Sequence, residues 1–104
     1  MQNNTKIIKD AIEVINTEIS GVKKLSKKIN KSFSDAIIAL SKNKGRVIIT
    51  GIGKSGHIAS KIASTMSSTG TPAQFCHSTE MSHGDLGIID KKDILIIISN
   101  SGNS

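Results

Sequence analysis

The sequence predicts a three-layer α/β protein, in which N-terminal helices precede a doubly wound parallel sheet. Apolar residues recur at helical spacing through most of the first 40 residues. Two β-branched runs, residues 47–49 and 94–98, follow polar breaks and are typical of buried strands. Between them, a glycine-rich turn leads directly into a helix-forming segment. The second half of the chain therefore has the strand and helix alternation of a parallel sheet.

Residues 1–44 are predicted to form a helical segment. Asn4 or Thr5 is the expected cap of its first helix. Gly21 either separates two helices or lies within one long helix. Because the segment holds no chemical motif, its expected role is packing, on the rest of the chain or on another copy. The apolar stripes comprise Ile7, Ile8, Ala11, Ile12, Ile15 and Ile19, and then Val22, Leu25, Ile29, Phe33, Ala36, Ile37 and Leu40.

Residues 45–104 are predicted to form the sheet domain. We expect strands at 47–49, 73–77 and 94–98, and a helix at 55–68. The last strand is an unbroken apolar run, which is typical of a strand buried on both faces of a parallel sheet. Three strands with one crossover helix correspond to the first half of a doubly wound domain, so we expect the chain to be a fragment of a longer protein.

Composition excludes several classes of function. The net charge of +6 could attract nucleic acid, but the chain has two aromatic residues and one arginine to read or stack on bases. The lysines are therefore interpreted as a solvated helix face. Cys76 is the single cysteine and cannot form an internal disulfide, which favours a reduced compartment. No apolar run has the length of a signal peptide or a membrane span, so the protein is expected in the cytoplasm, away from membranes.

The glycine-rich turn predicts an anion site. Gly51, Gly53 and Gly56 allow a sharp turn, and the N–H groups and dipole of the following helix favour a phosphate in front of it. The spacing matches the dinucleotide fingerprint, but Glu80 comes later than the acidic residue expected at the end of the next strand, and Lys54 is unusual in such a turn. A P-loop would require a glycine where the chain has Ile48, so that interpretation fails.

Two further groups of polar residues are candidates for the same site. Residues 99–102 (Ser-Asn-Ser-Gly) follow a buried strand and could cradle a phosphate, although such residues are also common in ordinary turns. Both loops would lie at one edge of the sheet, which favours a phosphate-bearing small molecule. His77, Glu80 and His83 could hold a zinc ion, hydrogen-bond the loop backbone or face a ligand at the strand ends.

Several stretches carry a family resemblance. They are residues 51–57 (Gly-Ile-Gly-Lys-Ser-Gly-His), 68–72 (Ser-Thr-Gly-Thr-Pro), His77, 82–87 (Ser-His-Gly-Asp-Leu-Gly) and 98–102 (Ile-Ser-Asn-Ser-Gly). In this order they resemble the sugar isomerase (SIS) domain, and within it the arabinose-5-phosphate isomerase group. The resemblance implies a five-stranded, Rossmann-like parallel sheet, of which this chain would be the first half, a homo-oligomer (a tetramer in the family) and often a following pair of CBS modules.

The resemblance also implies an activity and its residues. The activity is interconversion of D-ribulose 5-phosphate and D-arabinose 5-phosphate, an intramolecular oxidoreduction that feeds Kdo synthesis for lipopolysaccharide. Lys54 matches the catalytic lysine; no cofactor is required, although His77 matches a reported zinc position. The catalytic base is expected after Ser104, so the chain alone should be inactive, and Asn103 replaces the usual glutamate. The expected contacts to the phosphorylated pentose are Ser55, Gly70, Thr71, His77, His83, Ser99, Asn100, Ser101 and Ser104.

Two other functions fit the same residues. One is a non-catalytic SIS module that senses a phosphosugar, and the other is an oligomerising scaffold without a ligand. A regulator of the first kind would carry a DNA-binding domain, and the N-terminal stripes show no convincing helix-turn-helix.

Overall fold

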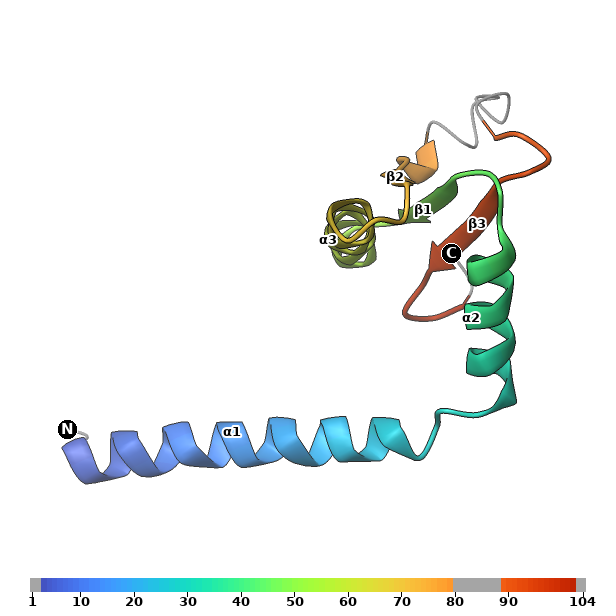
Figure 1. The fold of residues 1–104 in the computed structure, drawn as a ribbon. Helices are drawn as coiled ribbons and strands as arrows, with labels where there is room; N and C mark the ends of the chain where they lie inside the picture. Colours follow the sequence, from blue (N-terminus) through green and yellow to red (C-terminus); the bar gives the residue numbers. More distant parts are fainter. Residues whose placement is uncertain (1–2, 80–88, 103–104) are drawn as a thin grey trace. The chain divides into compact units, whose positions relative to one another are not determined.

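The structure is a computed structural model that describes residues 3–79 and 89–102 (Figure 1). It divides into two compact units, Met1–Ile37 and Ile38–Ser104. The elements are α1 (Asn4–Ser26), α2 (Lys31–Lys42), β1 (Val47–Gly51), α3 (Lys54–Ser68), β2 (Ala73–Phe75) and β3 (Ile94–Ile98). No helix in the described ranges is both long enough and apolar enough to cross a bilayer.

The second unit is built on a parallel three-stranded sheet in the order β2-β1-β3 (Figure 1). Val47 pairs with Ala73 on one side and with Ile94 on the other, and the β1–β3 ladder continues to Gly51 and Ile98. Because β1 is central, its backbone groups are paired on both sides. The predicted α/β class with a parallel sheet is confirmed.

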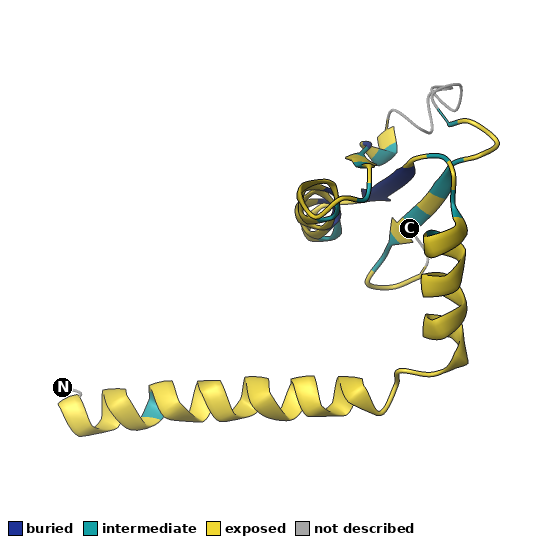
Figure 2. Ribbon diagram, in the orientation of Figure 1, coloured by how far each residue is buried: buried dark blue, intermediate teal, exposed yellow. Residues whose placement is uncertain are grey.

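Helix α3 packs on one face of this sheet through small residues. Its buried positions are Gly56, Ala59 and Ala63, which let the helix axis approach the strands closely. Figure 2 shows β1 buried along its length, and its Val47 and Ile49 form a buried cluster with Ala59 and Ala63. Burial of such a side chain stabilises the fold by about 1.5–3 kcal/mol. The partly buried side chains around this cluster are Leu40, Met66, Ala73, Phe75, Ile96 and Ile98.

Strand β3 departs from its prediction. Ile94, Ile96 and Ile98 are half-buried on the α3 side, but Leu95 and Ile97 are 39% and 63% exposed. The expectation of a strand buried on both faces is therefore wrong for the described residues. They cover β3 on one face only, because the helix that packs on this sheet lies on the side of Ile96 and Ile98.

The helical segment also differs in detail. Asn3 caps α1, rather than Asn4 or Thr5, since its Oδ1 accepts the Lys6 N–H at 2.8 Å. Gly21 lies inside α1, so it does not separate the helices. The break falls at residues 27–30, where Asn30 Oδ1 accepts the Ser32 N–H at 3.0 Å. The second apolar stripe is therefore divided between two helices, because a short amide side chain competes with continuous helix.

The predicted domain division after residue 44 remains a proposal. The structural division falls between Ile37 and Ile38, inside α2. Leu40 explains why the last turn of α2 belongs to the second unit, because its side chain packs against the core beneath α3.

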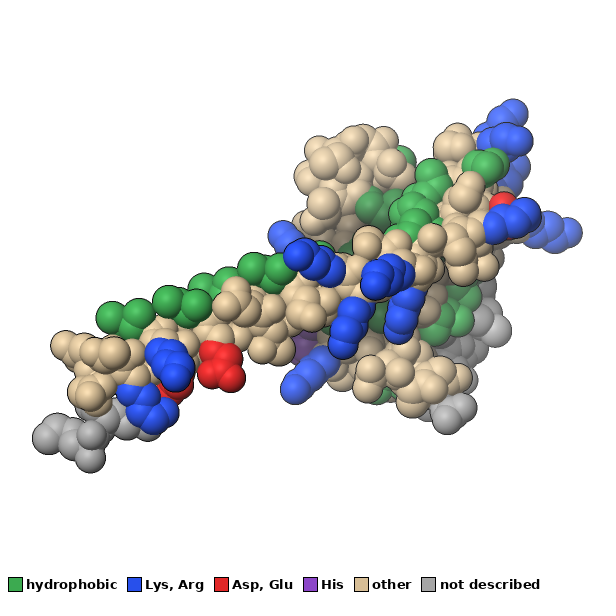
Figure 3. Space-filling model, turned by 90° about the horizontal axis from the view of Figure 1, so that it is seen from below, with side chains coloured by type: hydrophobic (Ala, Val, Ile, Leu, Met, Phe, Trp, Pro, Cys, Tyr) green, Lys and Arg blue, Asp and Glu red, His purple; other side chains and the backbone are tan. Residues whose placement is uncertain are grey.

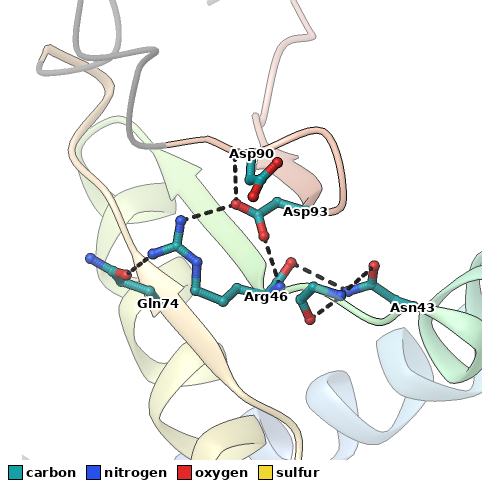
Figure 4. Close-up of polar contacts among 6 residues, drawn as sticks. Asn43, Arg46, Gln74, Asp90 and Asp93 are labelled. Carbon is teal, nitrogen blue, oxygen red and sulfur yellow. Dashed lines mark hydrogen bonds and ion pairs between the residues drawn. The ribbon is translucent and has the colours of Figure 1, made fainter.

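A polar network holds the amino ends of the strands together (Figure 4). Asp93, just before β3, accepts the Arg46 N–H at 2.8 Å and forms an ion pair with its guanidinium at 3.0 Å. Arg46 also donates to Gln74 of β2 at 3.2 Å. The Asp90 N–H donates to Asp93 at 2.8 Å. The Asp93 side chain is only 2% exposed, so its carboxylate joins the starts of β3 and β1 from a sheltered position, and Arg46 extends the network to β2.

This network makes stability depend on pH. The N–H groups of Asp90 and Arg46, together with the Arg46 guanidinium, lower the pKa of Asp93 from its ordinary 3.8. A group whose pKa is lower in the folded state than in the unfolded state stabilises the fold at pH values above its unfolded-state pKa. This stabilisation is lost as the pH falls through the folded-state pKa. We expect Asp93→Asn to reduce the free energy of unfolding at about pH 7 and to flatten its fall towards about pH 3.

Urea unfolding at the two pH values measures this effect. The matched control is Asp35→Asn, which removes an exposed i,i+4 pair with Lys31 and should change stability little. Equal effects of the two substitutions would contradict the role given to Asp93.

Candidate functional site at the carboxyl edge of the sheet

The turn between β1 and α3 depends on three glycines. A Cβ atom at Gly51 would lie 2.7 Å from the Ser55 carbonyl oxygen, and one at Gly56 would lie 2.9 Å from that of Gly51. Both distances are shorter than real side chains tolerate, so the end of β1 and the first turn of α3 touch backbone to backbone. Gly53 caps the helix at φ 61°, which favours glycine. The predicted strand–turn–helix unit is confirmed: the close backbone contact requires Gly51 and Gly56, and the positive φ favours glycine at position 53.

The N–H groups of this turn are less available than the sequence predicts. Ser55 donates to the Ile52 carbonyl at 3.1 Å, and Gly56 donates to the Gly53 carbonyl at 3.0 Å. Lys54 begins α3 and is exposed. The positive end of the α3 dipole lies at this edge and Lys54 stands in the first turn of the helix, so an anion is still favoured there.

The second predicted loop lies at the same edge. Ile98 pairs with Gly51, and Ser99 follows it directly. Ser99 Oγ accepts the Gly102 N–H at 2.9 Å, and Gly102 adopts φ 79°. Asn100 and Ser101 are exposed. The register thus confirms that both loops extend from strands ending at one edge, with Ser99 closing its own turn.

A cavity of about 390 Å³ opens beside the glycine turn. His77, which follows β2, contributes its ring, and Phe75 packs edge-on against it with centroids 5.0 Å apart. The lining residues are Gly51, Gly53, Gly56, His57, Ser60, Phe75 and His77. Such a crevice at the carboxyl ends of parallel strands is where open α/β sheets bind ligands.

The described part of this edge is polar and cationic. Lys54 is the charged group in residues 51–57, and His57 and His77 can each carry or donate a proton. Residues 76–79 and 99–102 contribute hydroxyls, amides and no carboxylate. An acidic ligand would meet no like charge from these residues.

Gly70 and Thr71 lie elsewhere. They precede β2, at the amino edge of the sheet, whereas the cavity is at the carboxyl edge. Gly70 adopts φ 106° and the Thr71 N–H donates to the Met66 carbonyl at 2.8 Å, so both residues help to end α3. The structure does not bring them to the cavity. His83 and Ser104, two other predicted contacts, and also Glu80 and Asn103 lie outside the described residues.

Sequence reasoning missed three features of this edge. His57 and Ser60 line the cavity from the first turns of α3. Their spacing of three residues could have predicted that they lie on the same face of the helix. Phe75 packs against His77. Because it lies two residues earlier along the chain at the end of a strand, the pleat predicts that both side chains point to the same face of the sheet. Thr50 is 4% exposed, and its hydroxyl has no hydrogen-bond partner among the described residues. Nothing in the run of β-branched residues indicates that this hydroxyl is buried without a partner among the described residues.

The structure does not test the possible zinc site, because two of its candidate ligands, Glu80 and His83, lie outside the described residues. Across residues 3–79 and 89–102, no group of three His, Cys, Asp or Glu side chains converges on one point. Protein zinc sites use three or four such ligands.

An open parallel sheet with a cavity and two polar loops at one edge is the arrangement in which α/β domains bind small molecules. Residues 39–104 match the family model described as the SIS domain. The chain therefore belongs to the SIS family, as its motifs predicted.

Curated relatives point to one group within the family. The chain is 50% identical over 103 residues to the arabinose 5-phosphate isomerase KdsD of Francisella tularensis, covering 96% of this chain and 32% of that protein. It is 44% identical to KdsD of Pseudomonas aeruginosa over its whole length, again 32% of the relative. The chain thus spans about a third of the length of these relatives.

Solved structures share the fold. The E. coli CFT073 protein c3406, solved in complex with arabinose 5-phosphate, is 42% identical with a TM-score of 0.89, covering 99% of this chain and 55% of that one. A sugar-phosphate isomerase from Listeria monocytogenes, itself assigned only provisionally, is 25% identical with a TM-score of 0.88, covering 100% of this chain and 55% of that one.

Substitution of Gly56 tests the backbone contact. We expect Gly56→Ala to lower the free energy of unfolding by about 1–3 kcal/mol, because the new methyl group meets the Gly51 carbonyl. The matched control is Gly21→Ala in α1, where a Cβ meets nothing within 4 Å and should raise helix stability by about 0.5–1 kcal/mol. Urea unfolding with circular dichroism measures both. A Gly56→Ala chain as stable as the original would contradict the close contact.

Proposed function

We propose that this chain binds a phosphorylated pentose at the carboxyl edge of its sheet and is part of an arabinose 5-phosphate isomerase. The observation that carries the proposal is the pairing of Gly51 with Ile98, which puts the glycine turn and the serine loop at one edge of the sheet, where the cavity borders the glycine turn. The identity to KdsD proteins and the likeness to a structure that holds arabinose 5-phosphate support the same substrate class.

The chemistry of this edge suits a sugar phosphate. The α3 dipole, Lys54 and the hydroxyls of the serine loop favour a phosphate dianion. Aldose–ketose isomerisation moves a proton between adjacent carbons through an enediolate, so it needs a base and a cation or donor at the oxygens. Lys54 would supply positive charge at those oxygens, and His77 would donate to a sugar hydroxyl from the cavity wall.

The finer features implied by the resemblance belong to the same proposal. They are a place in Kdo and lipopolysaccharide synthesis, a cytoplasmic location, a homo-oligomeric assembly and contacts from Ser55, Asn100 and Ser101. A zinc ion at His77 would need ligands beyond the residues described here. A contact from Gly70 or Thr71 would have to reach the sugar from the amino edge.

Calorimetric titration with arabinose 5-phosphate tests the binding site. We expect Lys54→Ala and His77→Ala each to weaken binding by about tenfold, as loss of a charge-assisted hydrogen bond would. Lys61→Ala is the matched control, because Lys61 is an exposed lysine two turns further along α3. Arabinose without its phosphate should bind far more weakly. Equal effects of the two lysine substitutions would contradict the proposal.

An isomerase assay separates binding from catalysis. The resemblance implies that the catalytic base follows residue 104. We therefore expect the 104-residue chain to bind arabinose 5-phosphate without forming ribulose 5-phosphate. Turnover would place a base within these residues. The alternative, a phosphosugar-sensing module, predicts no turnover even in a longer protein that carries the rest of the domain.

A further inference from the structure

One wall of the cavity at the carboxyl edge has no role in the proposed function. His57 and Ser60 form this wall from α3, where a spacing of three residues puts them on one face of the helix. His77 lines the cavity from the end of β2, and the Phe75 ring packs against His77. The glycine turn supplies the rest of the lining. The cavity thus lies between the first turns of α3 and the end of β2.

The two side chains of this wall are available to a ligand. His57 and Ser60 are exposed, and neither side chain forms a hydrogen bond with a residue that the structure describes. A neutral imidazole offers one donor and one acceptor, and a hydroxyl can both donate and accept. The described side chains that line the cavity include no carboxylate, lysine or arginine. This wall therefore suits the uncharged hydroxyls of a sugar better than its phosphate.

The strand order gives a bound sugar phosphate a direction. In the order β2-β1-β3, the glycine turn at the end of β1 stands between His77, which follows β2, and the serine loop, which follows β3. The outer strands lie about 10 Å apart, twice the spacing of neighbouring strands, which is comparable to the length of an extended pentose phosphate. Because the cavity wall has no permanent positive charge, the phosphate belongs on the side of Lys54 and the serine loop. The other end of the sugar, with C1 and C2, then lies toward the cavity.

We propose, on the basis of the proposed function, that His57 and Ser60 are specificity-determining residues that recognise the hydroxyl at C2 of the pentose. Arabinose 5-phosphate and ribose 5-phosphate differ only in the configuration at C2, and both aldoses correspond to the same ketose, ribulose 5-phosphate. Selection between them therefore depends on contacts at this carbon. Groups fixed on one face of α3 reach the C2 hydroxyl in one configuration and remain unpaired in the other, and such a site discriminates against the ligand that leaves it unpaired.

Calorimetric titration of the 104-residue chain with arabinose 5-phosphate, ribose 5-phosphate and inorganic phosphate tests the recognition of C2. We expect the original chain to bind arabinose 5-phosphate more tightly than ribose 5-phosphate. His57→Ala and Ser60→Ala should each weaken the binding of arabinose 5-phosphate by about threefold to tenfold, as loss of one hydrogen bond would. Each substitution should also reduce the preference over ribose 5-phosphate. Binding of inorganic phosphate should not change, because the phosphate lies away from this wall.

Two variants serve as controls. Ser64→Ala matches Ser60→Ala, because it makes the same change one turn further along α3 and outside the cavity, so it should leave all three affinities unchanged. His57→Gln keeps a donor and an acceptor, and it should restore part of the binding that His57→Ala loses. All the substituted side chains are exposed, so the fold should persist, and circular dichroism checks that it does.

The outcomes separate this role from the proposed function. Equal binding of the two pentose phosphates by the original chain, or a preference that survives both alanine substitutions, would overturn the role of His57 and Ser60 and leave the proposed function standing. Weaker binding of inorganic phosphate by His57→Ala would also overturn it, because His57 would then contact the phosphate. Failure of the original chain to bind arabinose 5-phosphate would overturn the proposed function and this role together.

Discussion

The contact on which the site depends is the backbone approach of Gly51 to Gly56. The central strand ends where the first turn of α3 presses against it, and neither residue has room for a Cβ atom. This contact fixes where α3 begins, and therefore where the positive end of its dipole lies and where Lys54 and His57 stand in its first turn. The cavity borders the same glycines, so its shape follows from the absence of two side chains.

The amino and carboxyl edges of the sheet have different roles. The amino edge holds the strands in register through Arg46 and Asp93, and it ends α3 at Gly70 and Thr71. The carboxyl edge carries the glycine turn, His77 and the serine loop. β1 connects the two edges through a fully buried strand, so a substitution at Asp93 is expected to act on the strands and not on the ligand contacts.

Sequence patterns correctly predicted the features that depend only on residues close together in the chain. The β1–turn–α3 unit follows from β-branched residues beside spaced glycines, and the shared edge of the two loops follows from parallel pairing. Features that depend on partners distant in sequence were missed. The isoleucines of α3 illustrate this, because the helix packs through Gly56, Ala59 and Ala63 and leaves Ile58 exposed. Side-chain size alone does not show which helical face is buried.

The same reasoning connects the small core to the exposed apolar residues of α1 (Figure 3). The largest fully buried side chains are three residues of one strand, Val47, Ile48 and Ile49, while the isoleucines of α1 and Ile97 of β3 lie exposed within their units. A chain of this size gains limited stability from its own core. Covering α1 with another copy would make part of that stability depend on protein concentration. Residues with no role at the sugar-phosphate site would then determine how much of the protein is folded to bind its ligand.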